Sequence, residues 1–154
     1  MRAFQRLLQS TLQFASGDSL VVLLNNQTQM EDKTDTTPAL NLSIIQPGDF
    51  LEIRGFLNTD PMIDVTASEI RRNTPDDDVL QGPLDDPVTT GVVSILRVQF
   101  TTDVINTSFD DGNSDSATFY SVVQPGCIVK VEDGDAPATL PDSIADEISL
   151  ESCP

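Results

Sequence analysis

Hydrophobic and charged residues alternate with a period of two in short stretches of this chain. Between residues 51 and 54, Leu51 and Ile53 alternate with two charged residues, and two valines repeat the pattern between residues 129 and 132. This period is typical of a β-strand with one buried and one solvated face. Helical periodicity is weak and confined to residues 2–12. The pattern therefore predicts a chain built mainly of strands.

Further strands are expected at residues 7–14, 19–24, 62–70, 92–100 and 144–150. Two tetrapeptides precede the alternating segments: Gln-Pro-Gly-Asp at residues 46–49 and Gln-Pro-Gly-Cys at residues 124–127. Proline suits the second position of a type II turn, and glycine accepts the positive φ of the third position. Each tetrapeptide is expected to form a turn that starts a strand.

The chain contains an internal repeat, which is best identified before a fold is assigned. Residues 44–53 and 122–131 share the Gln-Pro-Gly triplet and lie 78 positions apart, and the same offset aligns residues 67–70 with residues 145–148. Weaker matches align residues 28–32 with 107–111 at an offset of 79, and residues 8–10 with 80–82 at an offset of 72. We expect two domains, at residues 7–72 and 79–151, joined by a linker at residues 73–78.

The expected fold class is all-β, with little helix. Each copy has about 70 residues, which is enough for roughly five short strands. Closure into a small barrel removes the exposed edges of a flat sheet. We therefore expect two tandem small antiparallel β-barrels, either OB-like or sandwich-like.

Charge and composition exclude several classes of function. The chain carries 25 acidic and 8 basic residues, a formal charge of −17, and no histidine. Residues 1–75 account for −3 (6 basic, 9 acidic) and residues 76–154 for −14 (2 basic, 16 acidic). Such a field argues against nucleic acid as a partner, and the lack of histidine excludes imidazole-based catalysis and metal sites. We expect that the protein is not an enzyme. We also expect no transmembrane segment, because the longest apolar run, Leu20–Leu24, is far shorter than a membrane-spanning helix.

One acidic segment resembles a calcium-binding loop. Its candidate ligands are Asp110, Asp111, Asn113 and Asp115. Position six of the loop is Ser116 where glycine is required, and position twelve is Val122 where a bidentate glutamate is required. A solvated turn is the favoured interpretation, with an irregular calcium site as the alternative. No other cofactor is expected.

The two cysteines, Cys127 and Cys153, flank the last two predicted strands. A hairpin would bring them together, but bridging requires Cα atoms within about 7 Å. An intrachain disulfide, two free thiols and pairing between chains all remain open at this point.

The segments 79–84, 94–103 and 124–131 resemble the bacterial domain of unknown function 5666 family, and segments 47–55 and 67–70 of the first copy resemble the same family. The second copy departs from the first where Asp133 stands opposite Gly55 and Cys127 opposite Asp49. The resemblance implies a small all-β module, usually in tandem, in exported or envelope-associated bacterial proteins. It implies no catalytic residues.

We therefore expect a non-catalytic structural or interaction module of an exported bacterial protein, located outside the cell, in the periplasm or in the cell envelope. Its expected partner is protein, above all further copies of itself in an extracellular polymer or filament, because an unpaired strand edge is a template for another strand. The alternative is a module of the cell envelope that binds a small ligand or calcium.

Overall fold

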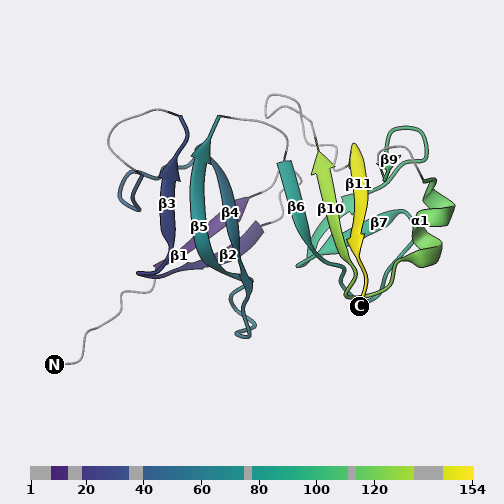
Figure 1. Cartoon of the computed structure of the whole chain (residues 1–154), viewed down its shortest axis with the longest axis horizontal. Coiled ribbons are helices and arrows are strands. Elements are labelled where there is room, and N and C mark those ends of the chain that lie inside the picture. Colours follow the sequence, from purple (N-terminus) through teal and green to yellow (C-terminus); the bar gives the residue numbers. More distant parts are fainter. Residues whose placement is uncertain (1–7, 14–18, 35–39, 75–77, 111–113, 134–143) are drawn as a thin grey trace. The chain divides into compact units, whose positions relative to one another are not determined.

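The computed structural model describes residues 8–13, 19–34, 40–74, 78–110, 114–133 and 144–154 (Figure 1). Strands dominate this part of the chain, and the one helix within it is short. The strands are β1 Leu8–Gln13, β2 Ser19–Leu24, β3 Gln29–Asp32, β4 Phe50–Leu57, β5 Val65–Asn73, β6 Asp78–Pro83, β7 Val92–Ile95, β8 Val98–Thr101, β9 Ser108–Phe109, β10 Ile128–Asp133 and β11 Glu147–Ser152, and the helix is α1 Ser116–Val122. The chain divides into two compact units, one with β3–β5 and most of β1 and β2, the other with β6–β11 and α1. The domain boundaries expected from the sequence, at residues 7–72 and 79–151, remain predictions.

Strand β5 is the centre of the first unit. Antiparallel β4 pairs with its whole length, from Phe50 opposite Asn73 to Leu57 opposite Val65. On the other edge of β5, parallel β2 pairs with its start and parallel β3 with its end, so that β3 and β4 flank β5 (Figure 1). Strand β1 extends the sheet beyond β2.

A threonine side chain bridges the gap between β2 and β3 along β5. The hydroxyl of Thr28 donates to the carbonyl of Ala67 at 2.9 Å and accepts from the backbone N–H of Asn25 at 3.1 Å. A buried strand leaves few carbonyls without a partner, because an unsatisfied one costs free energy. The Thr28 hydroxyl therefore takes the place of a backbone donor where the strand is interrupted.

The core of the first unit is a cluster of Val22, Leu24, Leu40, Ala67 and Ile70. The inward residues of β4, Leu51 and Ile53, pack against this cluster, as the alternating pattern predicted.

Antiparallel β10 and β11 form the centre of the second unit. Strand β6 pairs with the outer edge of β10, and parallel β9 pairs with β11, so that the sheet order is β6-β10-β11-β9 (Figure 1). A separate hairpin of β7 and β8 is linked to β6 through a bridge between Leu84 and Ile95. The fully buried side chains described in this unit are Val93, Ile95, Val98, Phe100, Phe119, Cys127, Val129, Val131, Ala145 and Ile148.

The two units share one strand register, shifted by 78 positions. Leu51 lies opposite Arg72 in the first unit, and Val129 lies opposite Leu150 in the second. The sequence repeat therefore corresponds to a repeat of strand pairing.

The upstream strands correct one part of the sequence alignment. Leu23 pairs with Thr66 in the first unit, and Thr101 pairs with Ile144, 78 positions later, in the second. This makes β8 the counterpart of β2, and β7 the counterpart of β1, which pairs with β2. The match of residues 8–10 with 80–82 was wrong, because residues 80–82 lie in β6, which pairs with β10 instead.

Both predicted type II turns are confirmed. The backbone N–H of residue 49 donates to the carbonyl of residue 46 at 3.0 Å, and residue 127 bonds to residue 124 in the same way, also at 3.0 Å. Gly48 and Gly126 have φ values of +97° and +86°. The turns start β4 and β10 as expected.

Three other predictions differ from the structure. The all-β class is correct, but the sheets of the described residues are open, so closure into barrels was wrong. Residues 92–100 form the β7–β8 hairpin rather than one strand. Helix α1 was not predicted because it is only seven residues long, and its stability comes from its cap and from burial of Phe119 against Phe109, with ring centroids 5.3 Å apart.

Replacement of Gly55 by alanine is expected to destabilise the first unit. Strand β4 has a register shift between Arg54 and Gly55, where a Cβ atom at Gly55 would lie 2.3 Å from the carbonyl oxygen of Thr66. The backbone must move to relieve this overlap, which we expect to lower the free energy of unfolding by about 2 to 3 kcal/mol. Urea denaturation of Gly55→Ala measures the loss. Ser68→Ala, which removes only an exposed hydrogen bond to Arg54, is the control, and equal stability of the two variants would contradict the expectation.

Candidate functional site

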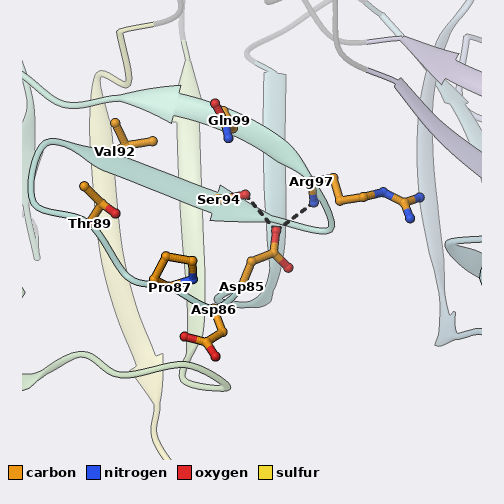
Figure 2. A pocket seen from close by; sticks show the side chains of 8 residues that line it. All are labelled: Asp85, Asp86, Pro87, Thr89, Val92, Ser94, Arg97 and Gln99. Carbon is orange, nitrogen blue, oxygen red and sulfur yellow. Dashed lines mark hydrogen bonds between the residues drawn. The ribbon is translucent and has the colours of Figure 1, made fainter.

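A hollow of about 630 Å³ lies beside the β7–β8 hairpin (Figure 2). It is lined by Asp85, Asp86, Pro87, Thr89, Val92, Ser94, Arg97 and Gln99. Its residues come from the loop that follows β6, from the two hairpin strands and, at Arg97, from the turn that joins these strands.

The turn of this hairpin has a strained backbone. Leu96 and Arg97 connect the paired residues Ile95 and Val98 and have φ values of +53° and +70°. Glycine and asparagine are the usual residues in such a turn, because other side chains crowd the backbone at positive φ. Strain of this kind persists only where neighbouring contacts hold it.

Asp85 supplies these contacts. One carboxylate oxygen, Oδ2, accepts from the backbone N–H of Arg97 and from the hydroxyl of Ser94, each at 2.7 Å (Figure 2). The backbone N–H of Asp85 donates to the carbonyl of Ser94 at 2.9 Å. Figure 2 also shows the side chains of Asp86 and Arg97 extending in different directions. The arrangement fixes a hairpin and does not aim a pair of carboxylates at a common point.

The structure describes two of the four candidate calcium ligands. The carboxylate of Asp110 accepts from the backbone N–H of Leu150 at 2.8 Å, and that of Asp115 accepts from the backbone N–H of Thr118 at 2.7 Å. Asp111 and Asn113 lie outside the described residues. Both described carboxylates therefore serve the backbone: Asp110 joins β9 to β11, and Asp115 caps α1.

The cap also affects the pKa of Asp115. Hydrogen bonds from the backbone and the side chain of Thr118 lower the pKa of Asp115 below its ordinary value of 3.8. Because the folded-state pKa is lowered, the cap stabilises the fold above that ordinary value, and its contribution is lost as the pH falls through the lowered one. Within the described ranges, no group of three or more acidic or cysteine side chains is placed to hold a metal ion.

Cys127 and Cys153 form a disulfide in the structure, with their Cα atoms 4.1 Å apart. Cys127 is fully buried at the start of β10, whereas Cys153 directly follows β11. The bond joins the two strand ends where Ile128 pairs with Ser152. It therefore holds the end of β11 against the turn that starts β10.

The outer edge of β4 differs from the equivalent edge in the second unit. There, β6 covers β10, with Gly82 opposite Val129 and Leu80 opposite Val131. Among the described residues, β4 pairs only with β5. The second copy thus has its edge covered by a strand, whereas no strand within the described part of the first copy covers the same edge.

Exposed apolar side chains lie at one end of this edge. Phe56 and Leu57, the last residues of β4, are 73% and 56% exposed, and Met62 in the following loop is 75% exposed. The loop is ordered by hydrogen bonds: Asp60 bonds to the side chain of Asn58, and Met62 bonds to the side chain of Asp60. We call Phe56, Leu57 and Met62 the apolar tip. Phe56 and Leu57 are successive strand residues and point to opposite faces of the sheet, so the apolar tip is a set of exposed apolar side chains at the end of the edge and not one continuous patch.

Ion pairs cover the outer face of the same sheet. Glu31, Arg71 and Glu52 lie side by side on β3, β5 and β4, and the Arg71 guanidinium contacts both carboxylates, at 3.1 Å and 3.8 Å. Opposite charges across neighbouring strands stabilise a sheet modestly. These charges account for the outward positions of the alternating pattern.

Sequence reasoning did not find the open edge of β4. The alternation is the same in residues 51–54 and 129–132, because the inward face is buried whether or not a further strand lies at the edge. The adjacent apolar residues Phe56 and Leu57 were the available signal, since they break the alternation at the end of the strand.

The fold and the site together define an all-β protein of two units with a common strand register. Residues 11–71 match the family model of a domain of unknown function, DUF5666, which supports that family for the first unit and agrees with the resemblance of its sequence. No curated protein and no solved structure matches the chain. No helix among the described residues is both long enough and apolar enough to cross a membrane.

Replacement of Asp85 by alanine is expected to destabilise the second unit. The Arg97 N–H and the Ser94 hydroxyl would lose their common acceptor, and the strained turn would lose its support. We expect the free energy of unfolding to fall by about 1 to 3 kcal/mol, measured by urea denaturation. Asp86→Ala, a neighbouring change of the same charge at an exposed residue, is the control. A loss of the same size in both variants would show that charge, not the hydrogen bonds, matters.

Removal of the disulfide is expected to loosen the end of β11. The bond closes a loop with a sequence separation of 26, and a loop of this length corresponds to about 3 kcal/mol. Unfolding of the double variant Cys127→Ser, Cys153→Ser, compared with the oxidised protein, measures the difference. Reductant should destabilise the unaltered protein and leave the double variant unchanged. Non-reducing peptide mass spectrometry checks the pairing, and two free thiols in the oxidised protein would contradict it.

Proposed function

We propose that this chain is a non-catalytic structural and interaction module of an exported bacterial protein, which self-associates through the edge of β4 into an extracellular polymer or filament. The observation that carries the proposal is the contrast between the covered edge of β10 and the open edge of β4. An edge strand presents a row of backbone donors and acceptors to any incoming strand. Strand β1 already pairs with β2 within its own unit. In the proposed assembly, the edge of β4 therefore accepts a strand from another copy.

Further observations support the proposed class and location. The common register of the units supports a second domain of the same family, although the family model matches the first unit alone. The disulfide suits an oxidising compartment such as the periplasm or the cell exterior. The hydrogen bonds of Asp85 support a structural role for the hollow rather than a catalytic one.

Self-association is expected to depend on the apolar tip. The Phe56→Lys variant places a charge at the exposed end of β4, and lysine on an edge strand opposes pairing with another chain. We expect the unaltered chain to form larger species as its concentration rises, and this variant to remain monomeric. Sedimentation velocity and electron microscopy of both proteins test this.

The matched control is Val104→Lys, which makes a similar change of charge at a residue of the second unit that is 81% exposed. This control should assemble like the unaltered chain. Monomers of the unaltered chain at every concentration, without fibres in micrographs, would overturn the proposed assembly.

A calcium titration distinguishes the proposed structural module from the alternative function, a cation-binding module of the cell envelope. The carboxylates of Asp110 and Asp115 already accept backbone N–H groups, so a cation at this segment would have to compete with two hydrogen bonds. We expect millimolar calcium to leave the melting temperature unchanged, relative to the same solution with a chelator. A saturable rise in melting temperature with calcium, but not with sodium at equal ionic strength, would favour the alternative.

A further inference from the structure

The second unit shows what kind of strand covers this edge. Strand β6 runs antiparallel to β10, from Asp78 opposite Asp133 to Pro83 opposite Ile128. Its Leu80 is buried, 7% exposed, whereas Val79 is 48% exposed. A covering strand thus places one apolar side chain over the core and keeps the neighbouring side chain at the surface.

The backbone of β4 has the orientation that such a strand requires. The N–H of Lys33 donates to the carbonyl of Arg72 at 2.8 Å, so the backbone groups of Arg72 face β3. In an antiparallel pair, the residue opposite such a position turns its own N–H and C=O away from its partner. Leu51 lies opposite Arg72, and its backbone groups therefore face the open edge. Ile53, two residues on, has the same orientation.

The same reasoning applies to the covered edge of β10. The N–H of Leu150 donates to the carboxylate of Asp110 on the β9 side, and Val129 lies opposite Leu150. The backbone groups of Val129 and Val131 therefore face β6, which pairs with both residues. Leu51 and Ile53 are the counterparts of these two valines at the offset of 78.

Both outward charges are exchanged between the two edges: Glu52 and Arg54 of β4 are the counterparts of Lys130 and Glu132 of β10. Glu132 lies opposite Val79 on β6, and its counterpart at the offset of 78 is Arg54, whose side chain is 60% exposed. Backbone groups of successive strand residues face opposite edges, so those of Arg54 face β5. Arg54 and the residue opposite it on an incoming strand would therefore form a non-hydrogen-bonded pair, in which side chains approach most closely. The Arg54 guanidinium already pairs with the carboxylate of Glu52 at 2.7 Å, and an acidic residue opposite Arg54 would place a second carboxylate beside the same exposed guanidinium.

We propose that the edge of β4 binds an extended segment of another protein chain as an antiparallel strand, in the register that β6 adopts on β10. This inference rests on the proposed function and adds the chemistry of the partner. The segment has an acidic residue opposite Arg54, an apolar residue opposite Ile53 and a glycine opposite Leu51. Apart from the acidic residue, this is the pattern of Val79, Leu80 and Gly82 in β6.

Two capped, fluorescently labelled peptides test the register. Both carry the sequence of residues 78–84, with Val79 replaced by glutamate in one peptide and by lysine in the other. Fluorescence anisotropy with the full chain, at a protein concentration where it is monomeric, measures their affinities. We expect the glutamate peptide to bind more tightly by about two- to fivefold, which is the range for a directly opposed charge pair. The Arg54→Glu variant should reverse the preference.

Amide hydrogen exchange provides a second measurement within the same molecule. The amides of Leu51 and Ile53 should exchange faster than those of Val129 and Val131 in the free chain. The glutamate peptide should slow the first pair and leave the second pair unchanged. Protection of other amides in place of these two, or a preference that Arg54→Glu does not reverse, would overturn the inference.

The outcome also separates this inference from the proposed function. Peptide binding by a chain that stays monomeric at every concentration would retain the inference and overturn self-association. Assembly that depends on Phe56, without saturable binding of either peptide up to millimolar concentration, would retain the proposed function and overturn this inference.

Discussion

The antiparallel pairing of two strands with a fixed register is the constraint on which each unit depends. In the first unit this pair is β4 with β5, and in the second it is β10 with β11. A shift of one residue would turn every inward side chain of a strand to the solvent. Because Leu51 and Val129 occupy the same place in this register, both units bury the same side of the sheet. Among the described strands, β2, β3, β6 and β9 add to the edges of these pairs, β1 extends the sheet beyond β2, and β7 and β8 form a separate hairpin.

The edges are where the two units differ, and the difference concerns function. Pairing at an edge uses backbone groups, which every residue other than proline possesses, so similar cores can carry different edges. The second unit covers the outer edge of its pair with β6, while the described part of the first unit leaves β4 open beside an exposed apolar tip. An interaction through the backbone of β4 would need no catalytic group and no metal.

Acidic side chains serve the loops of the second unit in three described cases. Asp85 holds the strained turn at Leu96 and Arg97, Asp110 joins the chain after β9 to β11, and Asp115 caps the helix. Each carboxylate accepts a backbone N–H, as aspartate commonly does where regular structure ends. These acidic residues therefore have structural explanations that need no bound cation.

Local sequence determined several of the longer strands, the two type II turns and the repeat, because alternation and the needs of proline and glycine act over a few residues. It did not predict the strands β3, β6 and β9. It did not show that residues 92–100 turn back at Leu96, since neither Leu96 nor Arg97 favours positive φ and the distant Asp85 supports them. Nor did it show the meeting of Cys127 and Cys153 or the open edge of β4. Tertiary structure alone decided these features, because strand neighbours are chosen by contacts between segments far apart in the chain.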